Sequence, residues 1–416
     1  MDLIIDNINQ AIVDTKKQLK KNLPDLKGIF NDLESDIKAE VSIIENLIKD
    51  GKTVIPEIHY EAINNEQVDK TIIASIKHRG CVVIRNVFPK SQVEDWNDEL
   101  VEYITENGYY EQCQEKVHLD QYFSTLQSGK PQVFGIYWSR PQVLARQDKR
   151  MAKTKAWLNN LWWCEQNAEF RIDPNKECTY ADRIRRREPG DSTFGLSPHT
   201  DAGSIERWID KGYQRVYRHV FSGTWQDYDP FDATYRTEIS EIPSPAVSRV
   251  FRTFQGWTAL TEQGPSDGTL KLIPIVRNIV YILYRALLDD VPEDSLCGAS
   301  PGRALNTSAE WHDLPLRGLV SIPNLFPGDT VWWHPDLTHA VEDLHEGNNF
   351  SNVMYIGASP MCNKNSDYLK TQGQRFLTGE SAPDFAAENY EVNYRGRATI
   401  DDLTNLGKKQ MGLMPW

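Results

Sequence analysis

The sequence predicts an α+β protein whose centre is a β-sandwich or jelly roll, with helices in front of it and along its rim. Helical periodicity fills residues 1–50, and alternating strand-like segments separated by Gly, Pro and Asp turns dominate residues 178–360. Short helical stretches flank and interrupt these segments. Helices placed around a β-rich centre are typical of the α+β class.

The composition is that of a globular chain, with 416 residues, 40% of them hydrophobic and 25% charged. The net charge of −13 repels phosphate backbones and anionic bilayers, so we expect neither nucleic acid nor a membrane as partner. Six scattered cysteines predict reduced thiols. The N-terminus has no signal-peptide pattern, and no run approaches the about 18 apolar residues of a membrane span. We therefore expect a cytoplasmic protein.

Residues 1–68 predict a helical extension. In DLESDIKAEVSIIENLIKDG, Gly51 supplies a stop signal, and apolar residues recur at three- and four-residue steps. These apolar residues are Leu33, Ile37, Val41, Ile44 and Leu47. Amphipathic helices of this kind pack on a neighbouring domain or on a second subunit. A homodimer formed through the N-terminal helices is therefore one expected arrangement.

Residues 69–375 predict the main domain, and residues 376–416 a segment that wraps it. The domain begins with a helix that ends at Gly80, a buried strand CVVIRNV and a second amphipathic helix. QVFGIYWS (132–139) predicts a strand, and AWLNNLWW (156–163) predicts a helix whose tryptophans belong to the core and a cleft wall. The later strand segments are YADRIRRRE, SRVFRTFQGWTAL, GTLKLIPI, GDTVWWH and NVMYIGAS, with a helix inserted at 276–290.

The motif GLSPHTDAGS (195–204) places His199 and Asp201 two positions apart. If this pair binds a metal, a third ligand must come from elsewhere in the chain. His339 is the best placed, because GDTVWWHPDLTH predicts a tight turn, a strand and a second turn that ends at this histidine. Two histidines and one carboxylate form a facial triad, which leaves iron positions open for a chelating co-substrate and for O₂.

Two other histidines compete with His339 for the third position. His334 lies in the predicted strand, where a core histidine bonded to the backbone is common. His345 lies in the polar loop LHEGNN, where we expect it to be solvated. The spacing after the Gly–Asp turn favours His339.

Three segments resemble, in the same order, the phytanoyl-CoA-hydroxylase-like branch of the Fe(II)/2-oxoglutarate-dependent oxygenases, and within it the YbiU-like group. They are RGCVVIRNVFPKSQVEDW, GWTALTEQGPSDGTLKLIP and GDTVWWHPDLTH. The resemblance covers about residues 70–375 and implies a double-stranded β-helix, that is, a jelly roll. It implies iron held by His199, Asp201 and His339, with 2-oxoglutarate as co-substrate and O₂ as oxidant. The implied reaction couples decarboxylation of 2-oxoglutarate to hydroxylation of a small-molecule substrate.

The sequence departs from this family at the group that anchors 2-oxoglutarate. The resemblance implies an Arg shortly after the distal histidine, but AVEDLHEGNNFSNVMYIG contains none, and Ser351 and Asn352 occupy that region. A neutral amide cannot neutralise a buried carboxylate. A cation from another strand must do so if the co-substrate is 2-oxoglutarate.

We predict Arg186 first and Arg252 second as this cation. Strand alternation in YADRIRRREPG puts Arg186 on one face with Ile184, and Arg252 lies in SRVFRTFQGW. A planar guanidinium suits bidentate binding of a carboxylate. Asn352 is a predicted polar contact, and Trp257 is a predicted wall of the pocket. Softer candidates near the site are Ser197, Ser204, Tyr137, Trp138 and Arg140.

The missing Arg keeps two alternatives open. The first is a cupin-like metalloenzyme of the same fold that does not use 2-oxoglutarate. The second is a non-catalytic metal-binding protein. Formation of succinate separates the oxygenase from the cupin-like enzyme, and the non-catalytic protein predicts no turnover.

Overall fold

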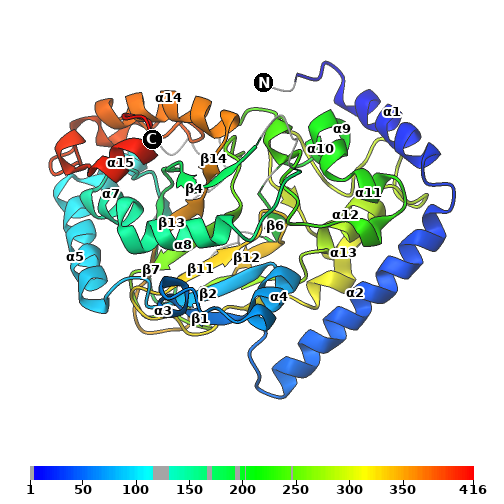
Figure 1. The fold of residues 1–416 in the computed structure, drawn as a ribbon, viewed down its shortest axis with the longest axis horizontal. Helices are drawn as coiled ribbons and strands as arrows, with labels where there is room; N and C mark the ends of the chain where they lie inside the picture. The colour runs from blue at the N-terminus through cyan, green and yellow to red at the C-terminus, as the bar shows by residue number, and fades with distance from the viewer. Residues whose placement is uncertain (1–3, 116–130, 166–170, 193–196, 202, 245–246) are drawn as a thin grey trace.

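The structure is a computed structural model that describes residues 4–115, 131–165, 171–192, 197–201, 203–244 and 247–416. Within these residues it has three β-sheets, none of them closed, surrounded by helices (Figure 1). This confirms the predicted α+β class. No helix of the described chain combines the length and the apolar character that crossing a membrane requires.

The largest sheet has seven strands in the order β1–β2–β11–β7–β13–β5–β3, and only the β1–β2 pair is parallel. Its strands are β1 (Glu57–His59), β2 (Cys81–Arg85), β3 (Val133–Phe134), β5 (Ile184–Arg187), β7 (Phe254–Ala259), β11 (Thr330–Trp333) and β13 (Ser351–Ala358). Side chains alternate between its faces. Val331 packs toward the second sheet, whereas Trp332 packs with apolar residues of helices α5 (Lys90–Glu106) and α8 (Lys149–Asn159).

The second sheet has five strands in the antiparallel order β10–β8–β12–β6–β9. Its strands are β6 (His199–Thr200), β8 (Leu270–Leu272), β9 (Leu305–Asn306), β10 (Val320–Ser321) and β12 (His339–Val341). Apolar residues of both sheets form one core cluster, so the two sheets face each other. A small sheet pairs β4 (Asp173–Glu177) with β14 (Pro360–Met361).

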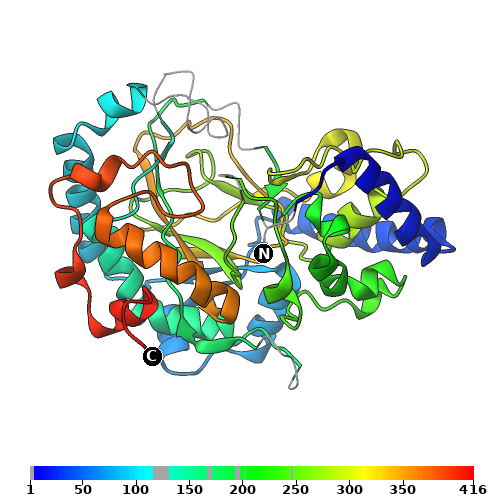
Figure 2. The same ribbon diagram turned by 90° about the horizontal axis from the view of Figure 1, so that it is seen from above.

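The helices form two groups on opposite sides of the sheets (Figures 1 and 2). One group is α1 (Ile8–Lys21), α2 (Leu26–Lys49), α9 (Glu206–Ile209), α10 (Lys211–Val216), α11 (Arg218–Phe221), α12 (Asn278–Arg285) and α13 (Ala309–Leu316). The other is α5 (Lys90–Glu106), α6 (Tyr109–Glu115), α7 (Arg140–Gln147), α8 (Lys149–Asn159), α14 (Asn363–Thr378) and α15 (Asn405–Gln410). Helices α3 (Tyr60–Asn64) and α4 (Lys70–Arg79) lie beside β1 and β2.

The predicted N-terminal helix is α2, and its apolar face packs inside the chain. Leu33, Ile37, Val41 and Ile44 are fully buried, and α2 packs against α12 and α13. The helix ends before Gly51, whose φ of +65° suits a helix stop. This face is therefore not available to a second subunit.

Several elements are shorter than the sequence predicts. Of QVFGIYWS, only Val133–Phe134 pairs in the sheet. Tyr137 and Trp138 leave it, because their backbone N–H groups donate to the buried carboxylate of Glu391. Helix α8 ends at Asn159, before Trp162, and α12 covers only Asn278–Arg285 of the predicted 276–290 helix.

Candidate metal centre

The structure brings His199, Asp201 and His339 together. Strands β6 and β12 are neighbours, and His339 pairs directly opposite His199, so the two imidazole centroids lie 4.3 Å apart. Asp201 follows β6 at once. Its Oδ1 is 3.1 Å from His199 Nε2, and its Oδ2 is 3.6 Å from His339 Nε2. One ligand atom from each residue falls within 4.8 Å of the others, close enough for a single metal ion.

Backbone carbonyls orient both imidazoles. The Nδ1 of His199 lies 2.7 Å from the carbonyl oxygen of Ser197, and the Nδ1 of His339 lies 3.3 Å from that of Leu337. A carbonyl only accepts, so each Nδ1 carries the proton and donates it. Each Nε2 then faces the carboxylate of Asp201. This is the arrangement that metal-binding histidines adopt.

The charges at the site suit a divalent cation. Burial opposes ionisation of Asp201, but the imidazoles of His339 and His199 hold the pKa of its carboxyl well below the usual range. Burial lowers the pKa of His339 to about 4, so this imidazole is neutral at pH 7. Burial also opposes the charging of His199, but its hydrogen bond to Asp201 prevails and raises its pKa. Two nitrogen donors and one carboxylate are a ligand set that Fe(II) accepts.

The two competing histidines already use both ring nitrogens. His334 Nε2 is 2.9 Å from the carbonyl oxygen of Pro230, and its Nδ1 accepts from the backbone N–H of Asp336. His345 Nε2 is 2.8 Å from the carbonyl oxygen of Asn349, and its Nδ1 accepts from Gly347. Neither histidine therefore has a ring nitrogen left to bind a metal. His345 is fully buried, so the expectation that it is solvated is wrong.

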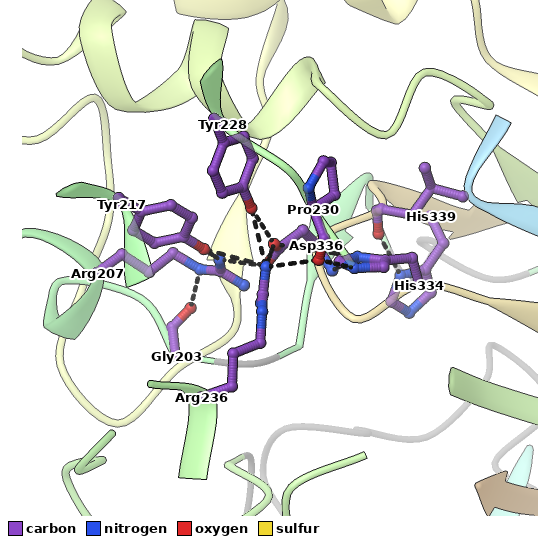
Figure 3. Close-up of polar contacts among 10 residues, drawn as sticks. Gly203, Arg207, Tyr217, Tyr228, Pro230, Arg236, His334, Asp336 and His339 are labelled. Carbon is purple, nitrogen blue, oxygen red and sulfur yellow. Dashed lines mark hydrogen bonds and ion pairs between the residues drawn. The ribbon is translucent and has the colours of Figure 1, made fainter. Parts of the chain in front are cut away.

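A buried ionic cluster around Asp336 lies beside the centre (Figure 3). Arg207 and Arg236 donate to its two carboxylate oxygens at 2.7 and 2.6 Å. Tyr217 and Tyr228 donate to the same oxygens at 3.0 and 2.9 Å. Burial opposes ionisation of Asp336, but the guanidiniums hold its pKa well below the usual range. The carboxylate has no exposed surface and is fully satisfied.

The Asp336 cluster is connected to both strands that carry the candidate metal ligands. Asp336 lies in the turn that leads into His339, and Arg207 Nε donates to the carbonyl of Gly203 at 3.1 Å. Gly203 in turn donates its N–H to the carbonyl of Asp201. Its φ is +79°, and an added Cβ would lie 2.7 Å from Tyr213 Oη. Sequence reasoning missed this cluster, because no spacing pattern links its members.

A cavity opens beside the three candidate ligands, between the two large sheets. Its polar lining includes Arg185, Arg252, Gln255, Trp257, Trp333 and Tyr355. Arg185 Nε, the indole nitrogens of Trp257 and Trp333, and both amide atoms of Gln255 are buried without a hydrogen-bond partner in the described chain. Buried polar atoms are normally bonded. The cavity is therefore suited to a polar ligand.

The predicted co-substrate residues are divided between two places. Trp257 and Arg252 line this cavity together with the three candidate ligands, so both lie near the site as the sequence predicts. Arg186 and Asn352 lie instead in a separate surface hollow, where the guanidinium of Arg186 sits 4.9 Å above the ring of Phe350. The predicted place of Arg186 is wrong, because Ile184 faces the helices and not the cavity. The same alternation then points Arg185 into the cavity.

The softer candidates have other partners. Ser204 is buried and accepts from the backbone N–H of Ser300, whereas Ser197 contributes its carbonyl. Tyr137 and Trp138 pack in a cluster with Phe376 and do not line the cavity. Arg140 is half-exposed beside Glu99 and Asp402. Gly195, Leu196 and Ala202 of the GLSPHTDAGS motif lie outside the described residues.

Comparison with known proteins finds relatives that match nearly the whole chain. Residues 6–413 match the Gig2-like family. The uncharacterized protein YbiU of Escherichia coli (strain K12) is 42% identical over 405 residues, which are 97% of this chain and 96% of YbiU. The crystal structure of a candidate oxidoreductase from Salmonella typhimurium LT2 is similar with a TM-score of 0.93, 39% identity and 99% of both chains covered. GlcNAc inducible gene 2 (GIG2, DUF1479) of Candida albicans is similar with a TM-score of 0.83 and 27% identity, over 100% of this chain and 91% of that chain.

Proposed function

This chain belongs to the Gig2-like family, and from its His199–Asp201–His339 centre we propose that it is a mononuclear non-haem Fe(II) oxygenase. In this proposal the two facing sheets are a double-stranded β-helix of the Fe(II)/2-oxoglutarate superfamily. The enzyme couples decarboxylation of 2-oxoglutarate to oxidation, by hydroxylation, of a small molecule. The observation that carries the proposal is the convergence of two oriented imidazoles and one carboxylate beside a cavity with unsatisfied polar atoms.

The three ligands fit a ferrous ion. His199 and His339 offer Nε2, held in place through their Nδ1 bonds to backbone carbonyls, and Asp201 offers a carboxylate with 31% of its side chain exposed toward the cavity. When bound, Fe(II) would supply the activation of O₂, for which side chains have no equivalent chemistry. The protein contributes the orientation of the ligands and a partly enclosed cavity that limits access of water.

Arg185 replaces Arg186 as the proposed anchor for the far carboxylate of 2-oxoglutarate. It is 2% exposed and lines the cavity, and it forms no ion pair within the described chain. Burial lowers the pKa of its guanidinium, partly offset by a hydrogen bond to Tyr355. A buried cation without a counter-charge is costly, and a bidentate carboxylate would complete it. Trp257, whose ring lies 5.7 Å from the Arg185 guanidinium, is the proposed wall.

The comparisons are in keeping with this chemistry. The Salmonella typhimurium relative is described as a candidate oxidoreductase, and its likeness extends over 99% of both chains. An oxygenase is a class of oxidoreductase. Neither YbiU nor GIG2 carries a stated reaction in its name.

The test is anaerobic titration of the Fe(II)-loaded protein with 2-oxoglutarate, followed through the metal-to-ligand charge-transfer band. We expect a band in the wild-type protein, no band in Asp201→Ala, and at least a hundredfold weaker 2-oxoglutarate binding in Arg185→Gln. Loss of a buried ion pair costs about 3–5 kcal/mol, which corresponds to this factor or more. Arg186→Gln is the matched control and should bind normally, because Arg186 lies in the other hollow.

Exposure of the same complex to O₂ should then yield succinate. A wild-type protein that binds iron but gives neither the band nor succinate would contradict the use of 2-oxoglutarate. The cupin-like metalloenzyme would then be the better description. A protein that binds no iron would contradict the metal centre itself.

A further inference from the structure

The cavity contains a second arginine that 2-oxoglutarate does not need. Arg252 lies in the segment before β7, is 9% exposed, and lines the cavity with the three metal ligands. Its guanidinium lies 5.0 Å above the ring of Tyr180, a cation–π contact that fixes its place and leaves its N–H edges free. Among the residues that the structure describes, Arg252 donates no hydrogen bond and forms no ion pair.

The acidic residues around Arg252 are already paired with other groups. Asp384 accepts from the backbone N–H and the Nε of Arg249 at 2.8 and 3.0 Å. Asp182 accepts from the backbone N–H of Arg183 at 2.7 Å and lies 3.5 Å from its Nε. Both carboxylates line the cavity, yet each meets its own arginine. The charge of Arg252 is therefore not balanced at contact distance by any residue that the structure describes.

A count of the charges in the site with metal and 2-oxoglutarate bound also leaves one positive charge without a partner. Metal-bound imidazoles are neutral, so a divalent cation together with Asp201 leaves one positive charge. Arg185 and Arg252 add two, and the 2-oxoglutarate dianion removes two. One positive charge remains in a cavity that is partly shielded from water. A buried charge without a partner is unfavourable, so a single negative charge is missing.

We propose that the primary substrate is a small monocarboxylate, and that Arg252 binds its carboxylate. This inference rests on the proposed function and names the substrate class of the same site. A planar guanidinium binds a carboxylate through two parallel N–H···O bonds. Val247, Tyr180 and Phe385 line the same cavity and give the remainder of the substrate an apolar surface.

The test uses matched probes, each a monocarboxylic acid and its primary amide: acetate and acetamide, and benzoate and benzamide. The protein loaded anaerobically with Fe(II) and 2-oxoglutarate is titrated with each probe, and binding is followed through the charge-transfer band. We expect each acid to bind at least tenfold more tightly than its amide. Arg252→Gln should abolish this preference, and Arg252→Lys should restore part of it. Equal binding of acids and amides by the wild-type protein, or no binding of any acid, would overturn the proposal.

The same variants separate the two arginines. Arg252→Gln should keep its affinity for 2-oxoglutarate within about threefold of the wild type, whereas Arg185→Gln should not. A greater than tenfold loss of 2-oxoglutarate binding in Arg252→Gln would assign Arg252 to the co-substrate and overturn the inference. Circular dichroism checks that the variants are folded.

A second measurement remains informative if the proposed function fails. The melting temperature of the Zn(II)-loaded Arg185→Gln variant is measured without 2-oxoglutarate, in the presence of each acid and of each amide. We expect the acids, but not the amides, to raise the melting temperature, and this effect to disappear in the Arg185→Gln/Arg252→Gln double variant. That result supports the carboxylate site whether or not the enzyme uses 2-oxoglutarate. Equal effects of acids and amides would overturn it.

Discussion

Asp201 belongs to the candidate metal centre and Asp336 to the ionic cluster beside it, and the chain treats the two carboxylates in opposite ways. Asp336 has no exposed surface and accepts from two guanidiniums and two phenols. Asp201 keeps 31% of its side chain exposed and contacts two imidazoles, that of His339, which is neutral at pH 7, and that of His199, whose pKa it raises. The chain supplies the positive charge for Asp336. At Asp201 the described residues supply no guanidinium, and in our proposal a metal cation completes the charge set.

The sharpest test of this comparison is the replacement of Asp336. Asp336→Asn leaves Arg207 and Arg236 buried without their counter-charge, so the free energy of unfolding should fall by about 3–5 kcal/mol. Asp201→Asn, the matched control, should cost the metal-free protein less than Asp336→Asn, since its partly exposed carboxylate contacts imidazoles and, within the described residues, no guanidinium. Urea unfolding of metal-free protein measures both. A loss in Asp201→Asn as large as in Asp336→Asn would remove the distinction.

Metal affinity should show the reverse order. His199→Ala, Asp201→Ala and His339→Ala should each weaken Fe(II) binding by at least about a hundredfold, because changes even to groups that only support a ligand cost about 10–100-fold. His345→Ala should change it by less than about threefold, since both ring nitrogens of His345 serve its own loop. Anaerobic equilibrium dialysis gives the affinities. Retention of metal by the His339 variant would refute the third ligand.

The glycine that connects the two carboxylates should have a smaller effect. Gly203→Ala places a Cβ against Tyr213 Oη at a φ of +79°, so it should cost about 1–3 kcal/mol and weaken metal binding by displacing Asp201. Gly190→Ala has a similar φ of +76° with open space around it, so it carries backbone strain alone. Its metal affinity should equal that of the wild type. Equal metal affinities in the two variants would show that Gly203 does not position the ligand.

Glu391 extends the comparison to a carboxylate with hardly any positive charge near it. It accepts from the backbone N–H groups of Tyr137 and Trp138 and from Tyr103 Oη. Burial raises its pKa to about 7, above the value of 4.5 in an unfolded chain. The folded state therefore binds the proton more tightly, and stability present at low pH is lost as the pH rises from about 4.5 through about 7.

Expressed per pH unit, this effect on the free energy of unfolding is small. Between these pH values the wild-type protein should lose up to about 1.4 kcal/mol of unfolding free energy per pH unit relative to Glu391→Gln, whose amide does not titrate. Urea unfolding at a series of pH values compares the two proteins. Parallel profiles would show that Glu391 is ionised in the folded chain, like Asp336.

The sequence carries enough information to propose the metal ligands but not the groups around them. His199 and Asp201 share one motif, and the turn at Gly328, with its φ of +95°, marks the strand that leads to His339. Periodicity separates Arg185 from Arg186, yet both faces of β5 are covered, so it cannot say which face meets the cavity. The deciding information is tertiary.

The same limit applies to the fold. The α+β class follows from blocks of helical and alternating patterns, and α2 follows from its apolar steps. The sequence predicts a longer strand over QVFGIYWS than the structure has. The local pattern does not reveal that Glu391, far along the chain, accepts from the backbone N–H groups of Tyr137 and Trp138. Nor does any local pattern pair Asp336 with Arg207 and Arg236. Buried polar partners distant in sequence leave no periodic signal.

The pairing of His339 opposite His199 also has a consequence for folding. The two residues are 140 positions apart, and closing a loop of that length costs about 4 kcal/mol of chain entropy beyond a constant. In the unfolded chain, only His199 and Asp201 are close enough to share an ion, and such a pair holds it weakly. In our proposal, tight uptake of metal must therefore wait until β6 and β12 have docked. A metal signal during refolding would time the arrival of these two strands, and chelators would accelerate loss of structure only after they separate.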